Sequence, residues 1–218
     1  SDTGLTRRFA LFFVTRKMNK GKPWRTMIMF FLAIVLLGLV STSSAICVLF
    51  MAIAEEMFKM TGYKKGEKLV ETTMVGIFWM AQGAMAFTPI SHVLIPAIFE
   101  NILADFGVTV TYGQFSMIFL CVGIAFFLGW ILIFRFVIKP DVTKMADLDI
   151  DALRATIKPW TKQEVTILIV YGIVIITWCF PELIGMIPGM DGVASWMSSL
   201  GSGVPPMVAC AVLCMIKY

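Results

Sequence analysis

One stretch constrains the fold of this chain more than any other. In residues 25–60, two apolar arms flank the tetrad Ser41-Thr42-Ser43-Ser44. Each arm is about 15 residues long, or about 22 Å as a helix, which is too short for the ~30 Å hydrocarbon core of a bilayer. Both arms end to end, about 50 Å, exceed that core. We therefore predict a re-entrant helical hairpin that turns at the tetrad. The alternative is one long tilted helix whose hydroxyls bond to its own carbonyls.

The charges on both sides of this stretch favour the hairpin. Lys and Arg accumulate on the cytoplasmic side of membrane proteins, so both basic ends should lie there, which a single crossing does not allow. The tip would then lie near the middle of the membrane, where irregular backbone is tolerated only inside protein or beside a wet cavity. The basic residues are Arg7, Arg8, Arg16, Lys17, Lys20, Lys22 and Arg25 on one side and Lys59, Lys64, Lys65 and Lys68 on the other.

The composition is typical of an integral membrane protein. Hydrophobic residues make up 59% of the chain and its mean hydropathy is +0.87, whereas soluble proteins contain roughly 45–50% apolar residues. The net charge of +4 comes from basic residues between apolar segments, so it indicates topology and not a nucleic-acid partner. The five cysteines lie in apolar runs without a metal-binding spacing. We expect an all-α protein embedded in the lipid bilayer of a cell membrane, with its basic loops in the cytoplasm.

The remaining segments follow from the alternation of apolar and charged residues. Residues 1–24 are expected to form an amphipathic helix along the cytoplasmic interface, with Leu5, Phe9, Phe12 and Phe13 on one side. Thr161 and Glu164 have the spacing of a capping box. The other expected segments are a broken transmembrane helix at 69–105, a transmembrane helix at 114–138, a cytoplasmic connector with a short helix at 139–160, a transmembrane helix at 161–181, an external loop at 182–203 and the start of a further transmembrane helix at 204–218.

The predicted helix at 69–105 is interrupted in its middle. Gln82-Gly83 is followed by Thr88-Pro89-Ile90-Ser91-His92 and then by Pro96, and proline breaks helical hydrogen bonding. A broken helix beside a re-entrant hairpin is an arrangement in which discontinuous helices build transport sites. His92, the single histidine of the chain, is expected to contact a substrate or take up a proton there. The alternative for His92 is a neutral side chain that caps the local backbone.

Several of these elements carry a resemblance to a known family. They are the amphipathic opening TGL-RRFAL at residues 3–11, the polar hairpin tip, the broken helix with Thr88-Pro89-Ile90, the exit RFVIKPD at 135–141 and the opening VPPMVA at 204–209. In this order they resemble the divalent anion:sodium symporter family. The chain has Thr42 where the family has Asn at the hairpin tip, and it lacks the Gly-Thr-Pro-Pro-Asn that follows the broken helix in the family.

The resemblance implies a function and a set of site residues. It implies secondary active transport of a di- or tricarboxylate or sulfate, coupled to sodium, by an elevator-type movement in a homodimer. The chain would supply one inverted repeat, about half of a family member, and the second half would be missing. The substrate-binding residues implied are Ser41, Thr42, Ser43, Ser44, Thr88, Pro89, Ser91 and His92. Sodium is the expected ion and no other cofactor is expected; its implied ligands are Ser41, Thr42, Gly83 and Ala84.

Physical chemistry adds a mechanism for holding the anion. The second hairpin arm begins just after the tetrad and the second half-helix begins near His92, so two positive helix N-termini would face one anion. Residues 69–134 contain no Lys or Arg. Two alternatives remain: a proton-coupled or arsenite-type relative, and a degenerate membrane scaffold that does not transport. An enzyme is not expected, because no paired carboxylates, Cys/His pair or metal-ligand set accompanies His92.

Overall fold

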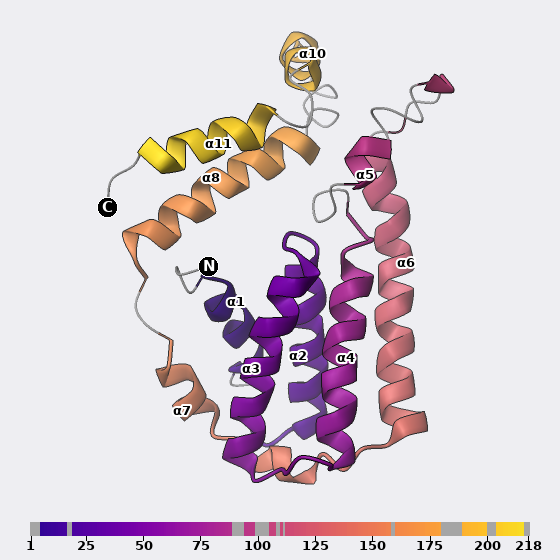
Figure 1. Ribbon diagram of the computed structural model, residues 1–218, viewed down its shortest axis with the longest axis vertical. Coiled ribbons are helices and arrows are strands. Elements are labelled where there is room, and N and C mark those ends of the chain that lie inside the picture. The colour runs from indigo at the N-terminus through magenta and orange to yellow at the C-terminus, as the bar shows by residue number, and fades with distance from the viewer. Residues whose placement is uncertain are drawn as a thin grey trace. The chain divides into compact units, whose positions relative to one another are not determined.

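The computed structural model describes residues 5–16, 19–88, 94–98, 105–107, 110, 112–157, 160–179, 189–199 and 204–215, and within these ranges its regular secondary structure is helical, without a strand (Figure 1). The expected all-α fold is therefore confirmed for them. The chain divides into two compact units: unit 1 contains residues 1–95 and 116–158, and unit 2 contains residues 96–115 and 159–218. The helices are α1 Leu5–Val14, α2 Pro23–Gly38, α3 Ser43–Thr61, α4 Lys68–Ala84, α5 Leu94–Ala97, α6 Tyr112–Leu132, the π-helix η3 Ile133–Ile138, the 3-10 helix η4 Thr143–Asp147, α7 Ile150–Ala155, α8 Lys162–Cys179, α10 Asp191–Ser199 and α11 Val204–Met215.

Helices α2 and α3 form a helix–turn–helix pair rather than one continuous helix. Pro23 opens α2, where the proline ring fits the first turn and its missing N–H removes no helical hydrogen bond. The helices are joined by residues 39–42, and α3 ends at Gly62, which adopts the left-handed conformation (φ 75°) that glycine accepts without steric cost. At 1.5 Å per residue α2 is about 24 Å long and α3 about 28 Å. The turn and the α3–α4 loop lie at opposite ends of unit 1 (Figure 1).

Helix α1 packs on α2 through a different face from the one its phenylalanines occupy. Ala10, Leu11 and Val14 are fully buried, whereas Phe9 and Phe12 remain more than two-fifths exposed. The end of α1 is fixed by the buried Asn19 side chain, whose Nδ2 donates to the carbonyls of Phe13 and Val14, each at 3.0 Å. Phe9 and Phe12 are thus left largely uncovered within unit 1, whereas Phe13 packs partly against its core.

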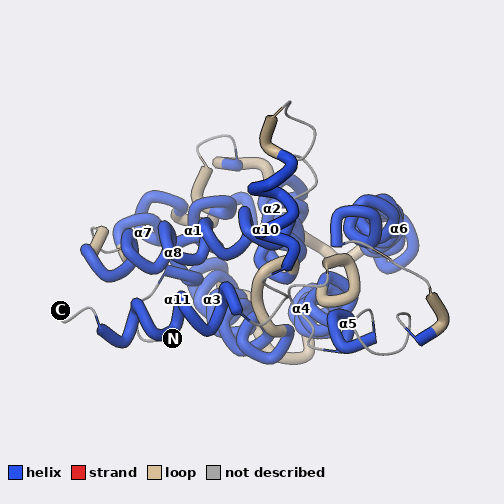
Figure 2. The backbone as a smooth tube through the Cα atoms, turned by 90° about the horizontal axis from the view of Figure 1, so that it is seen from above, coloured by secondary structure: helices blue, strands red, loops and turns tan. Residues whose placement is uncertain are grey.

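Aromatic rings and glycines join α6 to the rest of unit 1. Figure 2, which looks down the helices, places α6 at one edge of that unit. A Cβ atom on Gly76 of α4 would lie 2.5 Å from the Trp130 ring of α6, so only glycine leaves room for that ring. Phe31 of α2 makes edge-to-face contacts with Trp130 (5.8 Å) and Phe134 (5.3 Å), and each such pair contributes about 0.5–1.5 kcal/mol beyond area burial.

Within the part of the chain that the structure describes, one helix is long and apolar enough to cross a membrane. It runs from Gly113 to Ile138 through α6 and η3, and only 11% of its most apolar part is buried. A helix of this composition in the core of a water-soluble protein would be mostly covered by protein. At 1.5 Å per residue its 26 residues would reach about 39 Å, enough for a ~30 Å hydrocarbon core.

Unit 2 contains α8, α10 and α11, of which α8 and α11 pack against each other. The predicted capping box is confirmed at the start of α8. The Thr161 N–H donates to Oε2 of Glu164 at 2.9 Å, and the Glu164 N–H donates to Oγ1 of Thr161 at 3.2 Å. The Glu164 side chain is buried by this arrangement. Large apolar side chains on α8, such as Ile169 and Ile173, are more than half exposed.

Candidate functional site: the hairpin turn and the helix break

The polar tetrad lies at the turn between α2 and α3. Thr42 is the N-cap residue of α3 and Ser43 is its first residue, so Ser43 and Ser44 occupy the first helical turn. The N–H groups of Ser43, Ser44 and Ala45 have no acceptor among the described residues, because the first bond of the helix runs from the Ile46 N–H to the Thr42 carbonyl at 3.2 Å. Free N–H groups and the positive end of the helix dipole at this turn favour an anionic ligand.

The hydroxyls of the tetrad differ from other hydroxyls in these helices. Thr26, Thr61 and Thr166 each donate to the carbonyl four residues earlier, which is how a hydroxyl in an apolar helix is normally satisfied. The four tetrad hydroxyls make no hydrogen bond to any described residue, and Thr42 does not cap α3 with its side chain. Ser41 and Ser43 are half-buried, and Thr42 and Ser44 are exposed. All four hydroxyls are thus available to a ligand.

The helix break after α4 is joined to this turn. The Thr88 hydroxyl donates to the Leu39 carbonyl at 2.6 Å. Next to this bond, Gly38 at the end of α2 packs against Ala84 at the end of α4, so closely that a Cβ atom on Gly38 would collide with the Ala84 Cβ. Gly38 directly precedes Leu39, and Ala84 lies four residues before Thr88. In the sequence, a small residue precedes the tetrad and another precedes the break, which marks both as positions where helices can approach closely. The sequence does not show that these two residues, Gly38 and Ala84, contact each other.

The turn and the break lie at the level of the middle of the apolar helix. Gly83, at the end of α4, would collide with the Phe126 ring if it carried a Cβ atom, and a Cβ atom on Gly123 would lie 2.6 Å from the Phe87 ring. Phe126 is thirteen residues from Gly113 and twelve from Ile138, the two ends of that helix. The polar turn and the break are therefore placed midway along the one described helix that can span a bilayer.

The structure places some of the predicted site residues and not others. Ser41, Thr42, Ser43, Ser44 and Thr88 belong to the turn and the break, which the Thr88–Leu39 bond brings together. Pro89, Ser91 and His92 lie outside the described residues. Of the half-helix predicted after the break, the structure describes α5, only four residues long, so the second helix N-terminus expected to face the anion is not among the observed features.

The predicted sodium ligands Gly83 and Ala84 contribute backbone carbonyls. The Gly83 carbonyl accepts from the Ala86 N–H at 3.1 Å and the Ala84 carbonyl accepts from the Phe87 N–H at 3.2 Å. A carbonyl oxygen has two lone pairs, so each retains one for a cation. Among the described residues no group of three His, Cys, Asp or Glu side chains gathers at a metal-binding distance.

The two glutamates near the end of α3 have separate environments. Glu56 accepts from Arg7 of α1 at 2.8 Å, whereas Glu55 borders a cavity beside the α3–α4 loop.

Comparison of the chain with family models, with curated proteins and with solved structures found no match.

Proposed function

We propose that this chain is part of a secondary transporter of a small anion, a di- or tricarboxylate or sulfate, coupled to sodium. The single observation that carries the proposal is the polar turn bonded to a helix break, halfway along an exposed apolar helix. Unpaired hydroxyls and N–H groups are costly at that depth unless a ligand or water meets them. Discontinuous helices at the bilayer midplane are the places where such transporters bind their cargo.

The groups at the turn suit an anion and a small cation together. The N–H groups of Ser43 and Ser44, the tetrad hydroxyls and the α3 dipole are donors for carboxylate or sulfate oxygens. Hydroxyl oxygens of Ser41 and Thr42 and the carbonyls of Gly83 and Ala84 are the oxygen donors proposed for sodium. Since residues 69–134 contain no Lys or Arg, the positive charge that balances the anion is proposed to come from the co-transported ion and from the rest of the protein.

The wider assembly is proposed by analogy with the family that the sequence resembles. The chain would form about one inverted repeat of a homodimer that moves its transport part past a scaffold. The basic ends of the hairpin would face the cytoplasm in a cell membrane. The described helices are compatible with a hairpin of this kind. Helix α2 is about 24 Å long, which is shorter than the ~30 Å hydrocarbon core that a membrane-crossing helix spans.

Uptake of radiolabelled succinate, citrate and sulfate by the full protein in liposomes tests the proposal. We expect uptake of at least one of them to rise with an inward sodium gradient and to disappear when potassium replaces sodium. Uptake that is driven by a proton gradient in the absence of sodium would show that the coupling ion is the proton and not sodium. The absence of uptake of any of the three anions, with the protein folded in the liposomes, would contradict the proposal and favour a scaffold that does not transport.

Cysteine labelling tests the topology on which the proposal depends. In a variant without the native cysteines, we expect single cysteines at Lys22 and Lys64 to react with a membrane-impermeant maleimide from the same side, because both are exposed and flank the hairpin. A cysteine at Asp105, which is exposed and precedes α6, should react from the opposite side. Labelling of positions 22 and 64 from opposite sides would rule out the re-entrant hairpin.

A further inference from the structure

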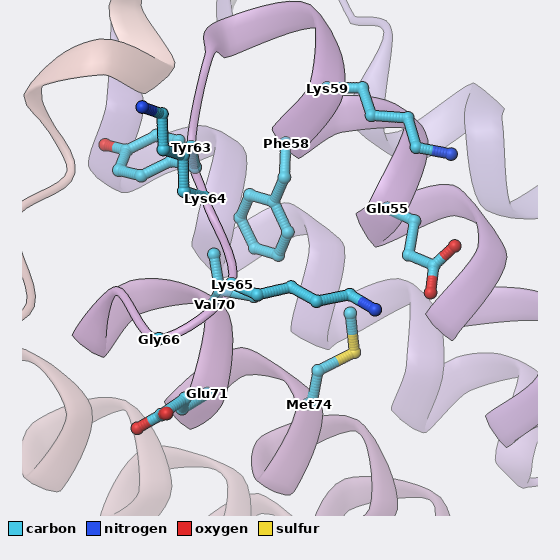
Figure 3. A pocket seen from close by; sticks show the side chains of 10 residues that line it. All are labelled: Glu55, Phe58, Lys59, Tyr63, Lys64, Lys65, Gly66, Val70, Glu71 and Met74. Carbon is cyan, nitrogen blue, oxygen red and sulfur yellow. The ribbon is translucent and has the colours of Figure 1, made fainter.

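A cavity lies at the end of unit 1 opposite the polar turn. It has a volume of about 540 Å³ and is formed by the end of α3, the α3–α4 loop and the start of α4 (Figure 3). This volume is within the ~300–1,000 Å³ range of small-molecule sites. Its charged residues are Glu55, Lys59, Lys64, Lys65 and Glu71. Three lysines and two glutamates give it a net charge of +1, and apolar side chains form the rest of its lining.

The lysines of this cavity are not neutralised by the nearest acidic loop residue. Glu67 accepts from the Lys64 N–H at 2.8 Å and from the Lys144 ammonium at 3.0 Å. These two bonds, the backbone one first, hold the pKa of the Glu67 carboxyl below its ordinary value, so Glu67 stays ionised and is already paired. Neither Lys59 nor Lys65 forms an ion pair with a carboxylate in the described part of the chain. Figure 3 shows Lys65 extended across the cavity towards the side of Met74.

The cavity lies at the level where the apolar helix ends. The Tyr63 hydroxyl donates to the Asp141 carbonyl at 2.9 Å, and Asp141 is three residues beyond Ile138, the last residue of that helix. Lys144, a little further along, reaches the Tyr63 ring at 4.8 Å. If Gly113–Ile138 crosses the bilayer, the cavity is at the depth of the lipid headgroups, where lysines extend their ammonium groups towards phosphates.

An exposed apolar strip leads from the cavity towards the polar turn. Val48 is seven residues before Glu55 on α3, Val75 is four residues after Glu71 and Phe78 is four residues after Met74 on α4. These spacings place each on the same helix face as its cavity residue. All three are more than half exposed. The strip therefore offers apolar contact to a chain that runs from the headgroup level into the bilayer.

We infer that this cavity binds an anionic phospholipid with one phosphate diester, its phosphate between Lys59 and Lys65 and an acyl chain along the Val48–Val75–Phe78 strip. The net charge of +1 matches the single negative charge of such a headgroup. A free phosphate would use the lysines but not the strip, and an uncharged lipid would use the strip but not the lysines. The inference depends on the membrane placement of α6, and it does not depend on transport.

Equilibrium binding of radiolabelled dioleoylphosphatidylglycerol to the full chain, delipidated and held in detergent micelles, tests this inference. We expect the double variant Lys59→Gln/Lys65→Gln to bind at least ~10-fold more weakly, because it loses two charge-assisted contacts. The matched control Lys22→Gln/Lys68→Gln removes the same charge from exposed lysines at the same end, outside the cavity. It should change the affinity by no more than about twofold.

A variant that is expected to bind more tightly serves as a control, because tighter binding cannot result from unfolding. Glu55→Gln removes a negative charge from the cavity rim near the C-terminal end of α3, where an acidic residue does not support the helix dipole. We expect it to bind the phospholipid about two- to fivefold more tightly. Equal weakening by the two lysine pairs, displacement of the lipid by inorganic phosphate, or equally tight binding of dioleoylglycerol would each overturn the assignment. These outcomes are independent of anion uptake, which is measured separately.

Discussion

If the proposed transport takes place, anion uptake is expected to fall at least ~10-fold when Ser43 is replaced by leucine, because a lost bond to a charged ligand alone costs about 1.5–3 kcal/mol. Ser43 is the first residue of α3, half-buried at the turn, so the leucine side chain would also occupy the space proposed for the ligand. Initial uptake rates in liposomes, normalised to the amount of folded protein, measure the effect.

Two variants make the Ser43 result specific. Ser43→Thr keeps the hydroxyl and should retain most of the uptake. Ser195→Leu, at an exposed serine of α10, makes the same chemical change away from the turn and should leave uptake within about twofold. If Ser43→Leu transported with unchanged kinetics, the tetrad would not be part of the binding site.

Replacing Gly38 with alanine is expected to lower the free energy of unfolding by about 1–3 kcal/mol, the usual cost of overpacking. The new Cβ would collide with the Ala84 Cβ, which cannot rotate away. The ends of α2 and α4 would have to separate, and this would also strain the bond from Thr88 to the Leu39 carbonyl. Denaturant unfolding in detergent micelles measures the loss.

A second substitution tests whether the contact itself is the cause. Gly38→Ala combined with Ala84→Gly moves the methyl group from one helix to the other, so the double variant should recover most of the lost stability through a coupling of about 0.5–3 kcal/mol. Gly129→Ala is the control, because a Cβ atom there would meet nothing within 4 Å. If the losses in the free energy of unfolding were additive in the double variant, the packing of α2 on α4 would not depend on the close approach of residues 38 and 84.

The sequence predicts well those features that depend on neighbours along the chain. The all-helical class follows from long apolar runs, and the Thr161–Glu164 capping box follows from a three-residue spacing whose two hydrogen bonds are present. The turn falls beside the tetrad because serine and threonine compete for backbone groups and favour helix starts. For the capping box and the turn, the physical cause is contained in fewer than ten residues.

Features that depend on contacts between distant segments could not be predicted in this way. The bond between Thr88 and Leu39 joins residues 49 positions apart. The local sequence around either residue does not identify the other as its partner. The face of α1 that packs inward is another example, since Ala10 and Leu11 are buried while Phe9 and Phe12 are exposed. Periodicity identifies an apolar side of a helix, but the packing partners decide which part of that side is covered.

The bond between Thr88 and Leu39 and the neighbouring contact between Gly38 and Ala84 together limit how these segments can move. The hairpin turn and the end of α4 are fastened to each other at two neighbouring points, so they would be displaced together as one rigid piece. In the proposed transporter, access to the ligand from either aqueous phase would then not be controlled by separating the turn from the break. The surface of relative movement would instead run along the outer faces of this pair, at the aromatic contacts with α6.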